Sequence, residues 1–142
     1  MKLSTIYPVI TTQKLQESKA FYTELFGFQI FFENDWYIHM GNGTQQLAFM
    51  LPDHPTQQDI FKKAYNGEGL VLCFEVKDAN AEFEAFQQKN VAIEVPLTDE
   101  AWGERHFALY DPNGIAINVT QMTQPSAEYQ EGYAPQGEPA AG

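Results

Sequence analysis

The side chains of this chain that could perform acid–base or metal chemistry are few and widely spaced. Its three histidines are His39, His54 and His106. No pair has the HxH or HxxxH spacing of a metal-binding motif, so the ligand count argues against a metal site built from them. His39 and His106 are each a candidate ligand-contacting or acid–base group, because imidazole titrates near neutral pH. A purely structural histidine is the alternative for both.

Nucleophilic chemistry has even less support in the sequence. Cys73 is the only cysteine, so no internal disulfide can form, and we interpret this residue as a small packing group. The chain has no GxSxG elbow, no phosphate-binding P-loop and no GxGxxG motif after a strand. We therefore assign no catalytic residue.

Composition limits the class of protein and of partner. With 142 residues and 44% hydrophobic content, the chain is long enough for one compact domain with a substantial core. Its net charge of −11 repels phosphate backbones, which argues against nucleic-acid and anionic-membrane partners. The charge is compatible with a cationic small molecule, but solubility alone is the simpler explanation of an acidic surface. The first ten residues lack a secretory signal pattern, and no stretch approaches the ~20 apolar residues that span a bilayer. We expect a soluble, cytoplasmic protein.

A β-hairpin with a closely specified turn is expected over residues 102–119. Asp111-Pro112-Asn113-Gly114 fits a type I turn followed by a left-handed glycine, which fixes the register of the two strands. One face then carries five large hydrophobic residues: Phe107, Leu109, Ile115, Ile117 and Val119. The opposite face carries a smaller and more polar set: His106, Ala108, Tyr110, Ala116, Asn118 and Thr120. The apolar face needs a covering helix, and the other face is suited to a ligand wall or to solvent.

Periodicity elsewhere predicts two similar modules of β-α-β-β-β order. The first has expected strands at 3–11, 28–32, 36–40 and 45–51, with a helix from Leu15 to Phe26. The second has expected strands at 70–76 and 91–95, a helix capped by Asp78, and the hairpin. The offset of about 64 positions between the first strands indicates a duplicated unit.

These elements give one domain over residues 1–122. Module 1 covers residues 1–51, the connector covers 52–69 with a short helix expected near 59–65, and module 2 covers 70–122. Residues 123–142 contain proline, glycine and acidic residues without hydrophobic periodicity, so we expect a mobile tail.

The strand faces left over by the helices share a chemical character. Period-2 alternation places Phe31, Tyr37 and Tyr110 on these faces, with Glu33 and Glu75 among them. Such a surface could hold a flat cationic ligand by stacking, cation–π attraction and charge pairing. Solvated carboxylates are the alternative for both glutamates.

Several of these segments resemble the glyoxalase, bleomycin-resistance and extradiol-dioxygenase superfamily. The resemblance covers about residues 3–122 and rests on three segments: LQESKAFYTELFGF, the Val76-Lys77-Asp78 start of a helix, and WGER running into DPNG. It is strongest toward the metal-free, bleomycin-resistance-like branch. It implies an α+β fold of two paired βαβββ modules that form a curved mixed sheet around a cavity. Lys14 departs from the family, which usually has Asp at this helix start.

Metal enzymes that this chain resembles take their ligands from the first and fourth strands of each module. The resemblance places those positions at Tyr7, Ala48, Val71 and Asn118. Alanine and valine offer no lone pair, and tyrosine and asparagine are poor ligands for a divalent transition metal. We therefore expect no metal and no other cofactor.

These observations favour a metal-free binding protein that sequesters an aromatic or cationic compound, as in antibiotic resistance. The candidate ligand contacts are Tyr7, Phe31, Glu33, Tyr37, His39, Met50, Glu75, Trp102, His106, Tyr110 and Asn118. One alternative is a lyase- or dioxygenase-like enzyme with a rebuilt metal site or a histidine acid–base group. Another is an interaction module whose acidic tail recruits a partner. The resemblance also implies a homodimer.

Overall fold

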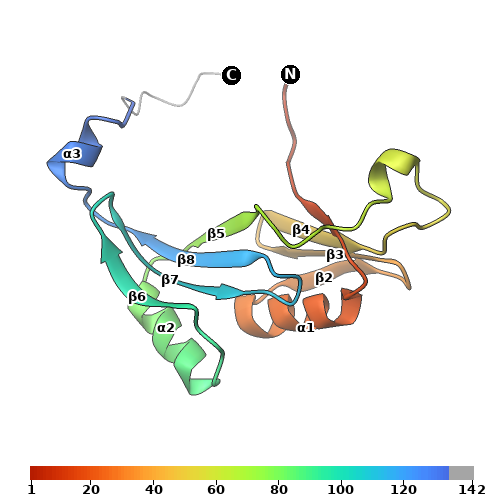
Figure 1. Ribbon diagram of the computed structural model, residues 1–142, viewed down its shortest axis with the longest axis horizontal. Helices are drawn as coiled ribbons and strands as arrows, with labels where there is room; N and C mark the ends of the chain where they lie inside the picture. Colours follow the sequence, from red (N-terminus) through yellow and green to blue (C-terminus); the bar gives the residue numbers. More distant parts are fainter. Residues whose placement is uncertain (135–142) are drawn as a thin grey trace. The chain divides into compact units, whose positions relative to one another are not determined.

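The computed structural model describes residues 1–134, which form two four-stranded β-sheets with accompanying helices (Figure 1). The chain divides into two compact units. The first contains residues 1–70 and 110–116, and the second contains residues 71–109 and, of the described residues, 117–134. Each unit is built around one sheet, and this α+β arrangement confirms the predicted fold class.

The first unit follows the predicted order of a strand, a helix and three strands. Its sheet has the order β1-β4-β3-β2, in which β1 is parallel to β4 and the other pairs are antiparallel. Its elements are β1 (Val9–Thr11), α1 (Leu15–Phe26), β2 (Gln29–Glu33), β3 (Tyr37–Asn42), β4 (Gln45–Met50) and a 3-10 helix, η1 (Asp59–Phe61), in the connector.

Helix α1 packs against β3 and β4 through an aromatic core. Tyr22 is fully buried and its ring lies 5.4 Å from that of Phe49. Lys14, at the helix start, provides no side-chain cap. Its Nζ instead donates to the carbonyl oxygen of Pro112 at 3.0 Å, while its backbone N–H donates to Oγ1 of Thr12. The lysine that departs from the family pattern therefore ties the helix start to the turn at 111–114.

The second unit has the sheet order β5-β8-β7-β6. Its elements are β5 (Val71–Glu75), α2 (Ala79–Gln88), β6 (Val95–Glu100), β7 (Glu104–Tyr110), β8 (Ala116–Met122) and α3 (Ala127–Gln130). Asp78 caps α2 as predicted, because its Oδ1 accepts from the backbone N–H of Ala81 at 3.0 Å.

The two faces of the β7–β8 hairpin differ in burial and polarity as expected. The ring of Phe107 packs against Phe83 and Phe86 of α2, with centroid distances of 5.3 and 5.4 Å. All five residues of the predicted apolar face are buried: Phe107, Leu109, Ile115, Ile117 and Val119. The polar set lies on the face opposite α2, which we call the open face of the second sheet.

The turn between these strands has the predicted chemistry. The backbone N–H of Asp111 donates to Ile115, and that of Gly114 donates to Asp111. Gly114 has a φ of 81°, in the left-handed region that glycine tolerates. The Asp111 side chain also accepts from the backbone N–H groups of Asn113 and Ile115. These hydrogen bonds satisfy the carboxylate of Asp111, so it can remain buried at this turn.

Two predicted strand boundaries are wrong. The first strand covers only Val9–Thr11, because Pro8 has no N–H for a ladder and Leu3 and Ile6 are exposed. The strand expected at 91–95 begins only at Val95. The backbone N–H of Val91 closes the end of α2 by donating to Phe86, so this residue belongs to the helix terminus.

The described part of the C-terminal segment, residues 123–134, contains α3 and is hydrogen-bonded to the β6–β7 turn at Ala101 and Gly103. The rest of the predicted tail, residues 135–142, lies outside the described residues. Within residues 1–134, no helix combines the length and the apolar character needed to cross a bilayer.

Candidate functional site

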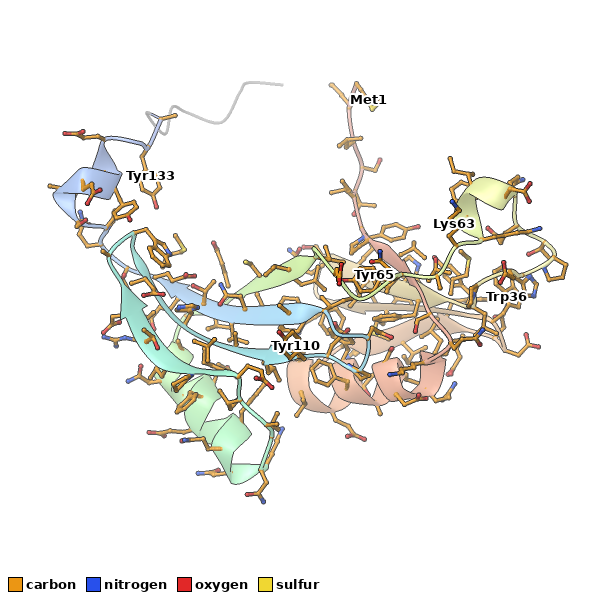
Figure 2. All side chains as sticks on the ribbon, viewed as in Figure 1. Met1, Trp36, Lys63, Tyr65, Tyr110 and Tyr133 are labelled. Atoms are coloured by element: carbon orange, nitrogen blue, oxygen red, sulfur yellow. The ribbon has the colours of Figure 1, made fainter. Side chains whose placement is uncertain are left out.

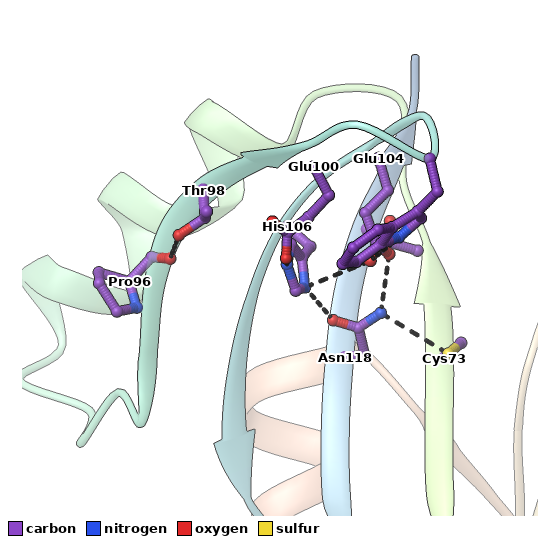
Figure 3. Close-up of polar contacts among 9 residues, drawn as sticks. Cys73, Pro96, Thr98, Glu100, Glu104, His106 and Asn118 are labelled. Carbon is purple, nitrogen blue, oxygen red and sulfur yellow. Dashed lines mark hydrogen bonds and ion pairs between the residues drawn. The ribbon is translucent and has the colours of Figure 1, made fainter. Parts of the chain in front are cut away.

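A network of polar side chains covers the open face of the second sheet, and Glu104 is its centre (Figure 3). Oε2 of Glu104 accepts from Oγ1 of Thr120 at 2.8 Å and from Nδ2 of Asn118 at 3.0 Å. Its Oε1 accepts from the indole Nε1 of Trp102 at 2.8 Å. Three donors from β8 and from the β6–β7 turn thus hold one carboxylate.

Each of the two ring nitrogens of His106 lies within hydrogen-bond distance of a side-chain oxygen. Nδ1 lies 2.6 Å from Oδ1 of Asn118, and Nε2 lies 3.1 Å from Oε2 of Glu100. Both neighbours accept hydrogen bonds, so the doubly protonated imidazolium satisfies both contacts. Burial lowers the pKa of His106, but the bonds to Asn118 and Glu100 and the charges of Glu104 and Glu100 outweigh it, so the pKa is raised.

The same network lowers the pKa of Glu104. Burial by itself raises it, but hydrogen bonds from Thr120, Trp102 and Asn118 and the charge of His106 act in the opposite direction and prevail. Glu104 therefore stays ionised. Its hydrogen bond from Nε1 of Trp102 fixes the orientation of the indole ring, although 44% of Trp102 is exposed.

A group of aromatic side chains surrounds His39 in the first unit. Its ring lies 4.6 Å from that of Tyr7, 6.1 Å from that of Phe31 and 6.2 Å from that of Tyr37. Nε2 of His39 lies 2.7 Å from Oε1 of Gln46. Burial, with the charge and hydrogen bond of Tyr7, raises the pKa of Tyr37. The rings expected to line a ligand cavity thus pack against a histidine of the protein itself.

The predicted position of Glu33 on this same face is wrong. A register shift between Ile30 and Phe32 interrupts the alternation of β2, so Phe32 pairs with His39 and Glu33 pairs with Ile38. Ile38 is fully buried on the α1 side of the sheet. Accordingly, Oε1 of Glu33 accepts from Nζ of Lys19 of α1 at 2.8 Å.

The remaining sequence candidates differ in their accessibility. Met50 is buried opposite Tyr37 in the first sheet. Glu75 is exposed on β5, two residues from Cys73, and Cys73 Sγ accepts from Nδ2 of Asn118 at 3.7 Å. Tyr110 is exposed at the end of β7 (Figure 2).

The structure therefore gathers the sequence candidates in two places. Trp102, His106 and Asn118 share the network on the second sheet. Tyr7, Phe31, Tyr37 and His39 share the aromatic group of the first.

Sequence reasoning missed several members of both groups. Glu104 lies two positions before His106, so strand alternation places it on the same face and could have identified it. Thr120 was placed on that face but was not chosen as a contact. Glu100 and Gln46 lie on strands that pair with those of His106 and His39, respectively. Their contacts with these histidines depend on a strand pairing that a single sequence does not reveal.

The metal-ligand positions implied by the resemblance do not fit a metal. Ala48 and Val71 carry no donor atom. Oδ1 of Asn118 already lies against Nδ1 of His106, and the Tyr7 ring packs on His39. Among residues 1–134, no three His, Cys, Asp or Glu side chains are grouped so that they could hold a metal ion. These donors do not support metal binding.

Comparison with solved structures places the chain among proteins of one fold. A protein of unknown function from Agrobacterium tumefaciens is 25% identical, with a TM-score of 0.65, over 85% of this chain and 95% of that one. A lactoylglutathione lyase from the same organism is 21% identical, with a TM-score of 0.68, over 85% and 96%. TioX from Micromonospora sp. ML1 is 16% identical, with a TM-score of 0.69, over 84% and 98%.

No curated protein matches the sequence. A family profile does match, over residues 5–119, which is most of the chain and extends from before β1 into β8. The chain belongs to the Glyoxalase/Bleomycin resistance protein/Dioxygenase superfamily.

Proposed function

We propose that this protein binds a small organic cation with a planar aromatic part, without a metal, on the open face of its second sheet. The main support for this proposal is the hydrogen bond between Trp102 and Glu104. Glu104 satisfies the polar edge of the indole, while Trp102 as a residue stays 44% exposed. An indole that donates to a carboxylate is also richer in electron density, which favours a cation over its face.

The charge of this face supports a cationic ligand. Glu75, Glu100 and Glu104 lie on it, and His106 is the basic residue among them. The chain as a whole has a net charge of −11. Such a field raises the local concentration of cations and speeds their association.

The same face offers apolar surface for the planar part of the ligand. Val71 and Cys73 alternate with the inward residues of β5, and both are exposed. Cys73 contacts Asn118, so it borders the polar network directly. Apolar area next to fixed polar groups is typical of small-molecule sites.

The state of the polar groups supports binding rather than catalysis. Both nitrogens of His106 lie against side-chain oxygens of the protein itself, Oδ1 of Asn118 and Oε2 of Glu100, so neither nitrogen is directed at a bound molecule. Glu104 accepts from three donors and is held ionised. A network that is satisfied in this way positions a ligand without reacting with it.

The proposal is tested by calorimetric titration and thermal shift with two three-ring compounds of opposite charge. Proflavine is a planar cation and anthracene-9-carboxylate is a planar anion. We expect proflavine to bind and to raise the unfolding temperature, because ligand at ~100 times its dissociation constant adds about 2.7 kcal/mol of stability. We expect no binding of the anion. Equal binding of the two compounds, or none of either, would contradict the proposal.

Two matched variants locate the site. Glu104→Gln keeps the shape of the side chain and removes its charge, so it should weaken proflavine binding by about tenfold. Glu33→Gln removes a charge on the α1 side of the first sheet and should leave proflavine binding unchanged. Metal content is measured on the same samples. Stoichiometric Zn, Ni, Mn or Fe would favour the competing enzyme hypothesis.

If the proposal holds, basic antibiotics are one class of natural ligand. Expression of the chain in a sensitive bacterium would then raise the inhibitory concentration of such a compound by sequestering it. The Glu104→Gln variant should protect less than the unchanged chain at equal expression.

A further inference from the structure

The C-terminal segment is attached to the β6–β7 turn by backbone hydrogen bonds. The N–H of Thr123 donates to the carbonyl of Gly103, and the N–H of Ser126 donates to that of Ala101, both at 2.9 Å. Gly103 has a φ of 102°, and a Cβ there would lie 2.9 Å from the carbonyl oxygen of Thr123. A glycine is thus required where the segment crosses the turn.

This attachment brings a second aromatic ring to Trp102. The ring centroids of Trp102 and Tyr129 are 6.2 Å apart and their planes are inclined at 68°. Tyr129 is 39% exposed, so both rings retain accessible surface. Oε1 of Glu104 lies 2.8 Å from the indole Nε1. Two inclined rings and a carboxylate therefore come together at one corner of the second unit.

The chemistry of this corner selects among cations. The π faces of aromatic rings attract positive charge, and a carboxylate nearby adds to the attraction. Trp102, Asn118 and Thr120 already use three of the roughly four acceptor positions of the Glu104 carboxylate, so an ammonium that needs to donate several hydrogen bonds is poorly satisfied here. A quaternary ammonium has no N–H to satisfy and carries its charge on methyl groups that can pack against rings.

We infer that Trp102 and Tyr129 form an aromatic corner that binds the quaternary ammonium group of a small organic cation. The segment 123–134 supplies one of its two walls. This inference rests on the proposed function, since it identifies the kind of cation that the open face takes and adds Tyr129 as a residue that determines specificity.

The test uses Trp102 itself as the reporter. The chain has two tryptophans, so Trp36→Phe leaves Trp102 as the single indole fluorophore. This variant is titrated with choline and with 3,3-dimethylbutan-1-ol, the neutral isostere of choline. We expect choline to change the Trp102 emission and to bind about tenfold more tightly than the alcohol. Equal affinity for the two compounds would overturn the inference.

Three substitutions at tyrosines complete the test in the Trp36→Phe background. Tyr129→Leu removes one wall and should weaken choline binding by about tenfold, while Tyr129→Phe keeps the ring and should retain the binding. Tyr133→Leu is the matched control, because Tyr133 lies in the same segment and is 51% exposed (Figure 2). Circular dichroism confirms that each variant is folded. Equal choline affinity in Tyr129→Leu and Tyr133→Leu would also overturn the inference.

The two proposals fail in different ways. If proflavine binds the unchanged protein and choline does not, the aromatic corner is wrong and the proposed function stands. If neither compound binds, both are wrong.

Discussion

Nδ1 of His106 and Oδ1 of Asn118 lie 2.6 Å apart on adjacent strands of the second sheet. The contact fixes the orientation of the Asn118 amide, because its oxygen faces the histidine and its Nδ2 must then face Glu104, at 3.0 Å. At a position where the family resemblance implies a metal ligand in the related enzymes, this chain has an internal hydrogen bond.

Replacement of His106 should change the pH dependence of stability. The folded state raises the pKa of His106, so the protonated histidine stabilises the fold below its unfolded pKa of about 6.5. That contribution is lost as the pH rises through the folded pKa. Denaturant unfolding of the unchanged protein and of His106→Gln should therefore differ more at pH 5.5 than at pH 9. An equal difference at both pH values would show that His106 is not charged in the fold.

Replacement of Glu104 should have the opposite dependence on pH. Its pKa is lowered in the fold, so the ionised carboxylate stabilises the protein above its unfolded pKa, and this contribution is lost as the pH falls through the folded pKa. At pH 7 we expect Glu104→Gln to cost about 1–2 kcal/mol of unfolding free energy, because charge-assisted bonds from three donors are weakened. The difference from the unchanged protein should shrink toward pH 3. A cost that stays constant with pH would contradict the role of the charge.

The buried pair of Tyr22 and Asp111 should make a measurable contribution to stability. The Tyr22 hydroxyl donates to Oδ2 of Asp111 at 2.7 Å, and both residues are buried. Burial, together with the charge and hydrogen bond of Asp111, raises the pKa of Tyr22. Tyr22→Phe should therefore cost about 1–3 kcal/mol in denaturant unfolding, since the carboxylate loses a donor.

Tyr65 provides the matched control for that substitution. Its hydroxyl is buried and has no hydrogen-bond partner among residues 1–134. Tyr65→Phe should leave the free energy of unfolding unchanged or raise it slightly, because it removes an unsatisfied polar group. A similar loss in both variants would mean that the bond to Asp111 is not the cause.

The homodimer expected from the family resemblance stays a prediction. Leu3, Ile6 and Val9 are exposed apolar residues in and before β1, and apolar surface of this kind is typical of an interface between chains. Light scattering of the purified protein should give twice the mass of one chain. Ile6→Asp should lower that mass toward a monomer. A monomer for the unchanged chain at micromolar concentration would refute the prediction.

Local chemistry made much of the fold predictable. The turn at 111–114 and the cap at Asp78 depend on residues within a few positions, so one sequence was enough. The alternation of β7 and β8 likewise predicted which face would be buried. The error at Glu33 arose because a bulge in β2 shifts the register, and nothing in the local pattern marks an inserted residue.

The site was less predictable, because its contacts join distant parts of the chain. Glu104 was missed although alternation from His106 places it on the same face. Tyr129 could not be inferred, since residues 123–134 read as polar and aperiodic. Its approach to Trp102 depends on backbone bonds from this segment to Ala101 and Gly103.

The measurement that tests the central claim most directly is calorimetric titration of proflavine into the protein before and after treatment with EDTA. Metal content is determined on both samples by mass spectrometry. We predict the same affinity and stoichiometry in the two titrations, with no stoichiometric transition metal in either sample. Binding that is lost after EDTA and restored by Zn²⁺, Ni²⁺, Mn²⁺ or Fe²⁺ would contradict the claim.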